Sequence, residues 1–304
     1  MQQPYDLIQC RDISLFPHYF MDIPNRNPHW HDGWEIDAVL DGSVSLVASG
    51  REMQLNAGEA VLFMPQEPHW VRRVGAGNRI LSIHVSPAFY HAFFPELDMV
   101  CFSENLVGSI CGEKGLREFF RRMGVAAAVS ETSFGYPLEL ARAVCDLLSW
   151  LLLEVPYRLL TGEEQRANRN KMKRLRRLTE AIQSNYGKKL LLSDLAERER
   201  LSMTYLSRFF KEHLFLSFQE YLGNVRLGYA VWLAEETNMS TKQIGSQCGF
   251  SDPRYLQRLF VKEFGGSLAE FRESIKTARQ NSLYPLPSYR LYTPEETATF
   301  LLSR

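Results

Sequence analysis

Cysteine is scarce in this sequence of 304 residues, and no two cysteines form a Cys-x-x-Cys pair. The five cysteines lie far apart, and an odd, scattered set argues against a disulfide framework and indicates reduced thiols. The densest apolar stretch, Leu147 to Leu153, is much too short to span a bilayer. The first residues do not combine a basic start with an apolar run. We therefore expect a cytoplasmic protein with no membrane partner.

Net charge is also missing, because 35 Lys and Arg balance 35 Asp and Glu. This balance hides an asymmetry between the two halves. Residues 1–167 carry 13 basic and 21 acidic residues, a net charge of −8, whereas residues 168–281 carry 20 and 12, a net charge of +8. An acidic half joined to a basic half is expected when only one part meets a polyanion. Chance variation between domains is the alternative.

The first half of the chain has a strand pattern followed by a helical one. Apolar and polar residues alternate with period two from residue 14 to 86, and turn pairs such as Asp41-Gly42 interrupt them. Many short strands of this kind predict a small barrel or sandwich. In residues 137–155 the period is helical, and we expect this helix to form a homodimer contact, with a core helix inside the domain as the alternative. Its apolar stripe contains Leu138, Ala141, Cys145, Leu148, Leu152 and Val155.

A repeat dominates the second half of the chain. The segment "SMTYLSRFFKE" (202–212) recurs as "DPRYLQRLFVKE" (252–263). Each copy opens on an N-cap residue, Ser202 or Asp252, and Pro253 takes the first helical position of the second copy. A shorter helical stretch precedes each copy, which makes the helix-turn-helix pattern, present here twice.

The segment between the copies predicts their spacing. Residues 217–237 are expected to form one helix, opened by the capping box Ser217 and Glu220. About 20 residues at 1.5 Å each give roughly 30 Å. Successive major-groove turns on one side of B-DNA lie about 34 Å apart, so one chain could place both second helices in adjacent turns.

The outer face of each second helix carries side chains suited to DNA. Arg and Gln pair bidentately with base edges in the major groove, and Ser and Lys suit phosphate oxygens. A pair of amphipathic hairpins with solvated outer faces is the alternative. These faces present Thr204, Ser207, Arg208 and Lys211 in the first copy, and Arg254, Gln257 and Arg258 in the second.

Residues 190–272 resemble the DNA-binding domain of the AraC/XylS family of bacterial transcription regulators. The matches run from Leu195-Ala196 through both copies to Phe271-Arg272, and "GFSD…YL…R.F…FG" is the most diagnostic block. The resemblance implies two helix-turn-helix subdomains that bind promoter DNA and usually activate transcription, with RNA polymerase as a further partner. It places base-reading contacts on Thr204, Ser207, Arg208, Pro253, Arg254, Gln257 and Arg258.

Three positions depart from the family pattern. The family usually has Gly where Phe215 stands, and Phe does not adopt the left-handed cap cheaply, so we expect the first recognition helix to end differently. A cation is common in the family at the position of Val261, and Ser267-Leu268 stands where the family has Thr-Pro.

The segment "HWHDGWEIDAVLDG" (29–42) resembles the first cupin motif, and residues 58–70 resemble the second. The matching ligand positions are His29, His31, Glu35 and His69, a set that suits iron, manganese or zinc. Ile23 and Arg73 replace a glycine and an asparagine of the motifs, which argues against a metal. A polar cluster without metal and a small-molecule effector pocket are the other interpretations.

We expect the effector pocket, for example for a sugar, and no cofactor. Its candidate residues are His29, His31, Trp34, Glu35, His69 and His84. Trp34 and Glu35 are adjacent, so they must face opposite sides of a regular strand.

The sequence as a whole predicts an α+β multidomain protein. A cupin-like β-barrel with flanking helices (residues 1–160) binds effector and dimerises, and a linker (161–170) follows. An all-α domain with two helix-turn-helix units (171–281) binds DNA, and a C-terminal extension (282–304) has no assigned role. We expect a sequence-specific transcriptional activator without enzymatic activity. The alternative is a cupin metalloenzyme with an accessory helical domain.

Overall fold

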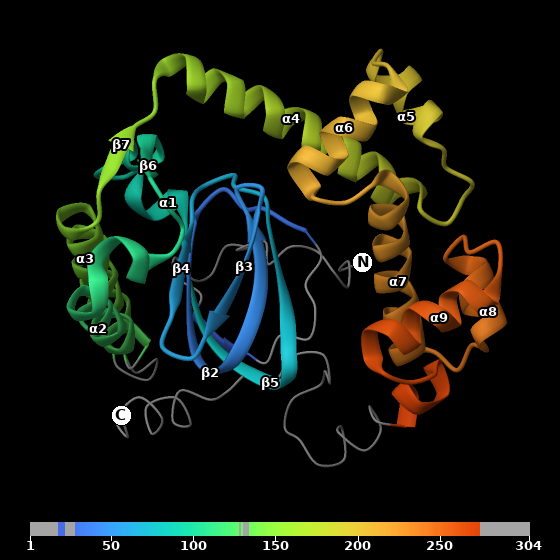
Figure 1. Cartoon of the computed structure of the whole chain (residues 1–304), viewed down its shortest axis with the longest axis horizontal. Coiled ribbons are helices and arrows are strands. Elements are labelled where there is room, and N and C mark those ends of the chain that lie inside the picture. Colours follow the sequence, from blue (N-terminus) through green and yellow to red (C-terminus); the bar gives the residue numbers. More distant parts are fainter. Residues whose placement is uncertain (1–17, 22–27, 128, 130–133, 274–304) are drawn as a thin grey trace. The chain divides into compact units, whose positions relative to one another are not determined.

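The computed structural model describes residues 18–21, 28–127, 129 and 134–273, so the expected extension 282–304 lies outside the described residues. The chain divides into two compact units (Figure 1). The main segment of the first unit starts at residue 30, and that of the second starts at residue 168. The first unit is rich in strands and the second is helical. The predicted class, an N-terminal sheet domain followed by an all-α domain, is therefore confirmed.

The first unit is built on one antiparallel sheet. Its strands are β1 (His18–Met21), β2 (Trp34–Ala48), β3 (Arg51–Asn56), β4 (Ala60–Phe63) and β5 (His69–Val85). They follow the order β1-β5-β2-β3, and β4 also pairs with β2. The two long strands β2 and β5 pair along nearly their whole length, with irregularities at Val39–Asp41 and Gly42–Ser43. The alternation in the sequence thus reflects two long, bent strands more than many short ones.

Helices cover one side of this sheet (Figure 1). The elements after β5 are α1 (Pro87–Tyr90), the 3-10 helix η1 (Pro95–Met99), β6 (Val100–Phe102), α2 (Val107–Ala127), α3 (Tyr136–Glu154) and β7 (Tyr157–Leu159). Helix α3 buries Leu140, Leu147 and Leu151 in the core. Leu138, from the apolar stripe noted in the sequence, is 78% exposed. Leu148 and Val155 of the same stripe are buried, so the stripe is divided between the core and the exposed side of α3 that carries Leu138.

The second unit contains most of α4 (Gly162–Asn185), followed by α5 (Leu192–Glu199), α6 (Met203–Leu214), α7 (Phe218–Glu236), α8 (Thr241–Gln247) and α9 (Pro253–Phe264). The predicted N-caps are confirmed, because Ser202 accepts from the Tyr205 N–H and Asp252 from the Arg254 N–H. The capping boxes at Ser217 and Ser240 are also present. Two helix pairs, α5–α6 and α8–α9, are joined by the single helix α7, as the repeat predicts.

The segment predicted as a linker, residues 161–170, is mostly helical. Helix α4 begins at Gly162, inside this segment. The cause is a local cap: the Glu164 N–H donates to Thr161 Oγ1, and the Thr161 N–H donates to the Glu164 carboxylate. Arg158 of β7 donates two more hydrogen bonds to Glu164.

The expectation that Phe215 avoids the left-handed conformation was wrong. Phe215 caps α6 with φ 58° and ψ 12°. This conformation costs a residue with a Cβ about 1–2 kcal/mol. Leu214 and Leu216 on either side are both buried, so their packing offsets that cost and holds the turn in place.

Candidate functional site

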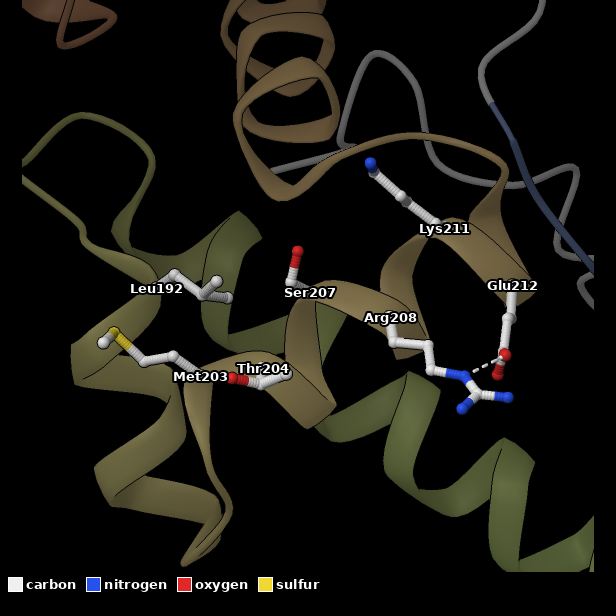
Figure 2. Close-up of a pocket in the computed structure, with 7 residues that line it drawn as sticks. All are labelled: Leu192, Met203, Thr204, Ser207, Arg208, Lys211 and Glu212. Carbon is white, nitrogen blue, oxygen red and sulfur yellow. Dashed lines mark hydrogen bonds and ion pairs between the residues drawn. The ribbon is translucent and has the colours of Figure 1, made fainter.

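The outer faces of α6 and α9 carry the residues predicted to read DNA. On α6, Thr204, Arg208 and Lys211 are exposed and Ser207 is half-buried. These four residues line a shallow hollow together with Leu192, Met203 and Glu212 (Figure 2). On α9, Arg254 and Arg258 are exposed, and Pro253 and Gln257 are half-buried.

The opposite faces of α6 and α9 hold the two helices in the domain. Leu206 and Phe210 are buried on α6, and Leu256 and Phe260 are their counterparts on α9. Phe210 packs against Phe218 and Tyr221 of α7, with ring centroids 5.8 and 6.1 Å away. The buried apolar side of each second helix thus anchors it in the domain. Its polar side faces outward, where it can contact DNA.

Two of the candidate arginines are paired with acids, a feature that the sequence analysis missed. Arg208 Nε lies 2.5 Å from Glu212 Oε1 (Figure 2), and Arg254 Nε lies 3.0 Å from Asp252 Oδ2. The spacing of Glu212 four residues after Arg208 on a helix was the available signal. Hydrogen bonds from Arg254 hold the pKa of Asp252 below its ordinary value. Arg258 differs, since its guanidinium lies 5.7 Å from the Tyr255 ring centroid.

The second group of candidate residues surrounds one buried carboxylate. Glu35 is fully buried on β2, and the strand register places it directly opposite His84 on β5. Its Oε2 lies 2.5 Å from His31 Nε2 and 3.2 Å from His69 Nε2. Its Oε1 lies 3.4 Å from His84 Nε2. The Ser82 hydroxyl donates to Oε1 over 3.2 Å.

These neighbours set the charge of Glu35. Burial acts to raise its pKa, but the charge of His84 and hydrogen bonds from His31, His69 and His84 act in the opposite direction and prevail. The pKa of Glu35 is therefore held well below its ordinary value, and the side chain is a carboxylate at neutral pH. The interior of the sheet domain thus holds a charged, hydrogen-bonding centre.

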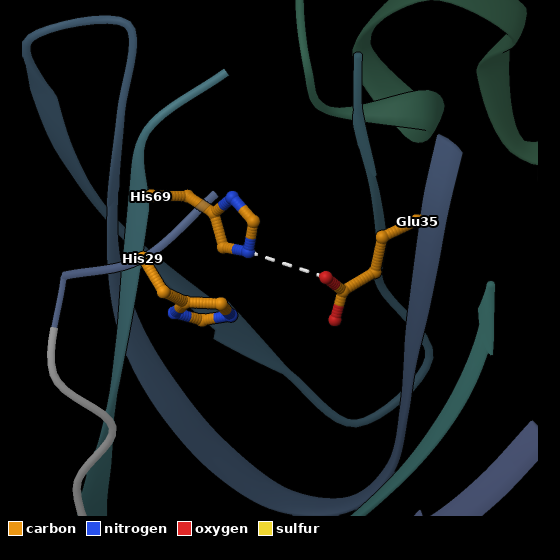
Figure 3. A group of neighbouring side chains, drawn as sticks. All are labelled: His29, Glu35 and His69. Carbon is orange, nitrogen blue, oxygen red and sulfur yellow. Dashed lines mark ion pairs between the residues drawn. The ribbon is translucent and has the colours of Figure 1, made fainter. Parts of the chain in front are cut away.

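Two overlapping groups share this carboxylate. The ligand atoms of His29, Glu35 and His69 lie within 4.8 Å of one another (Figure 3), and so do those of His31, Glu35 and His84. Imidazole and carboxylate are donors that bind first-row transition metals. Among the described residues, both groups therefore have the composition of a metal site.

The structure brings together five of the six predicted effector residues and separates the sixth. Trp34 faces the hydrophobic core, where its ring centroid lies 5.5 Å from that of Phe102. Its neighbour Glu35 faces the histidines, as strand alternation requires. Ser82, which the sequence analysis did not single out, joins the cluster because it lies two residues before His84 on the same face of β5.

Comparison with known proteins agrees with this two-part arrangement. A family model described as an AraC-like ligand binding domain matches residues 21–148, and one described as a helix-turn-helix domain matches residues 195–274. The Msm operon regulatory protein of Streptococcus mutans is 31% identical over 286 residues, which cover 87% of this chain and 94% of that protein. The chain belongs to the AraC family of transcriptional regulators.

Other members of the AraC family are also similar along most of their length. The HTH-type transcriptional activator RhaS of Escherichia fergusonii is 33% identical over 251 residues, covering 81% of this chain and 87% of RhaS. The melibiose operon regulatory protein of Escherichia coli is 21% identical over 286 residues, covering 88% and 93%. These relatives are regulators of transcription, as the sequence predicts for this chain. None of the helices that the structure describes is both long and apolar enough for a membrane crossing.

Proposed function

We propose that this AraC-family regulator reads promoter DNA with α6 and α9 and changes its DNA affinity when a small polar effector binds at the Glu35 cluster. The duplicated polar face carries the proposal: both second helices expose arginines at matching positions, Arg208 and Arg258. Basic charge is concentrated in this half, with a net +8 over residues 168–281. Such a regulator acts in the cytoplasm, where it meets RNA polymerase on the promoter.

The proposed effector is a polyhydroxylated molecule such as a sugar. Support comes from the names of the relatives, which include a melibiose operon regulator and RhaS. Support also comes from the cluster, since imidazole and carboxylate groups gathered around Glu35 suit hydroxyl donors and acceptors. A thermal-shift screen of the full chain with sugars tests this directly, and DNA affinity is then measured with the sugar that stabilises it.

The two DNA-facing roles should separate on mutation. Arg258→Ala should weaken binding to the preferred operator by about 1–3 kcal/mol, roughly 5- to 150-fold, and should relax base preference at one position. Lys211→Ala should weaken all duplexes about equally, because a phosphate contact carries no sequence information. Affinities measured on a panel of single-base operator variants provide the comparison.

Arg117 offers the matched control for this experiment. It is an exposed arginine on α2, paired with Glu113, in the acidic half of the chain. Arg117→Ala should leave operator affinity unchanged. If Arg258→Ala and Lys211→Ala behaved like Arg117→Ala, the proposed contact faces would be wrong.

We also propose a homodimer formed through the exposed side of α3 that carries Leu138. Leu138 is 78% exposed there, and Ala141, Cys145 and Leu152 on the same stripe are half-buried. Leu138→Glu should convert the dimer to a monomer in sedimentation velocity, and the monomer should still unfold cooperatively because the side chain makes little contact within its own unit. Leu159→Glu, at a 54% exposed leucine of β7, is the control and should remain dimeric. A wild-type chain that is monomeric at micromolar concentration would refute the dimer.

A further inference from the structure

The Glu35 cluster has a chemistry beyond effector recognition. We propose that His31, Glu35 and His84 bind one divalent first-row transition-metal ion. The resemblance to the cupin motifs indicates a different set that includes His29 and His69. The geometry around Glu35 instead points to His84, which the motif spacing does not contain.

The separations of the ligand atoms fit an ion. Bonds of about 2.0–2.2 Å from nitrogen and oxygen to the metal place two adjacent ligand atoms about 3 Å apart. The distance from His84 Nε2 to Glu35 Oε1 is 3.4 Å, and that from His31 Nε2 to Glu35 Oε2 is 2.5 Å. All three ligand atoms lie within 4.8 Å of one another. Small side-chain rotations therefore suffice to place the three donors around one ion.

The hydrogen-bonding of His31 orients it as a ligand. Its Nδ1 lies 2.8 Å from the Gly33 carbonyl oxygen, which can only accept, so Nδ1 carries the proton. His31 Nε2 faces Glu35 Oε2 at 2.5 Å and shares a proton with it, and a metal ion that binds here displaces that proton. A backbone carbonyl bound to the far nitrogen is the usual support of a metal-ligating histidine, since it fixes the tautomer and the ring orientation.

The backbone holds the other two ligands in place. Glu35 and His84 are paired residues on the adjacent strands β2 and β5, so their side chains leave the sheet on the same face. Ser82, on that face of β5, donates to Glu35 Oε1 and lies 3.3 Å from His84 Nε2, so it links the two side chains. The side chains of Glu35 and His84 are 1% and 4% exposed, which shields a bound ion from competing water. We assign the ion to this group because register and hydrogen bonds position all three donors.

The test is a titration of the full-length, chelator-treated protein with Co²⁺. We expect saturable binding of one ion per chain, visible absorption bands typical of Co²⁺ with nitrogen and oxygen ligands, and a higher melting temperature. His84→Ala should weaken Co²⁺ binding at least tenfold. His91→Ala is the matched control, because His91 is an exposed histidine paired with Asp98 outside the cluster, and it should bind like wild type.

A second measurement uses the wild-type protein, so it tests the proposal even if the His84→Ala variant does not fold. X-ray absorption of the Co²⁺-loaded protein should count two imidazole ligands. Absence of saturable binding would overturn the proposal, and so would a folded His84→Ala variant that binds Co²⁺ like wild type. Loss of binding in His29→Ala with full binding in His84→Ala would assign the ion to the other group and would equally overturn it. DNA affinity is measured on the same samples, so a failed metal site is distinguishable from a failed DNA-binding proposal.

Discussion

Gly249→Ala should disrupt the second helix-turn-helix unit and abolish operator binding. Gly249 follows the C-cap of α8 with φ +76°, a conformation that costs an alanine about 1–2 kcal/mol. An added Cβ would also lie 2.6 Å from the Tyr186 carbonyl oxygen. That oxygen cannot easily retreat, because it accepts a hydrogen bond from Arg226 Nε over 2.8 Å. Relieving the overlap adds about 1–3 kcal/mol.

The melting temperature of the DNA-binding unit should therefore fall by at least about 10 °C, since each kcal/mol shifts a domain of this size by roughly 4–8 °C. Gly265→Ala is the control that isolates the steric part. Gly265 has nearly the same φ, +73°, but an added Cβ would meet no atom within 4 Å. It should cost only about 1–2 kcal/mol and should retain DNA binding. If the two variants lost the same melting temperature, the contact between the added Cβ and the Tyr186 carbonyl oxygen would not contribute to the destabilisation.

Glu35→Leu should destabilise the sheet domain by about 3–5 kcal/mol, the usual cost of removing one partner from a buried charged group. The carboxylate lies within 3.4 Å of nitrogens from His31, His69 and His84, and leucine offers none of them an acceptor. For a unit of this size the melting temperature should drop by roughly 10 °C. Unfolding is followed by differential scanning calorimetry in the presence of a chelator, so that metal binding does not contribute.

Glu52→Leu is the control for this substitution. Glu52 lies exposed on β3 of the same sheet, where it accepts a hydrogen bond from Ser45. The change should alter stability by no more than about 0.5 kcal/mol. If Glu35→Leu had the same melting temperature as Glu52→Leu, the hydrogen bonds between the Glu35 carboxylate and the histidines would not stabilise the domain.

The helical half of the fold is readable from the sequence because its signals are local. Ser202 caps α6 through a backbone N–H three residues on, and Ser240 with Gln243 forms the N-terminal capping box of α8 over the same distance. Such hydrogen bonds require only neighbouring residues, so residue type and spacing determine them. The start of α4 is local too, but Thr161 was overlooked because the first turns of the helix carry no apolar stripe.

The candidate site in the sheet was less predictable for a physical reason. That Glu35 and Trp34 face opposite sides follows from strand alternation alone. The pairing of Glu35 with His84 does not, because it depends on the register between β2 and β5, which shifts at Val39–Asp41. A single slip of register would move His84 to the other face. Likewise, Phe215 takes its left-handed turn because the buried neighbours Leu214 and Leu216 demand it, and local propensity does not reveal that.

The acids that accompany Arg208 and Arg254 have a consequence for discrimination among promoters. Each of these arginines already holds a carboxylate partner, Glu212 or Asp252, before any DNA arrives. On the proposed contact faces, a base edge must compete with that internal anion to capture the guanidinium. On a duplex without a suitable acceptor, the arginines keep their carboxylate partners. Such a mismatched site gains little binding energy from them, so the protein dissociates from it quickly.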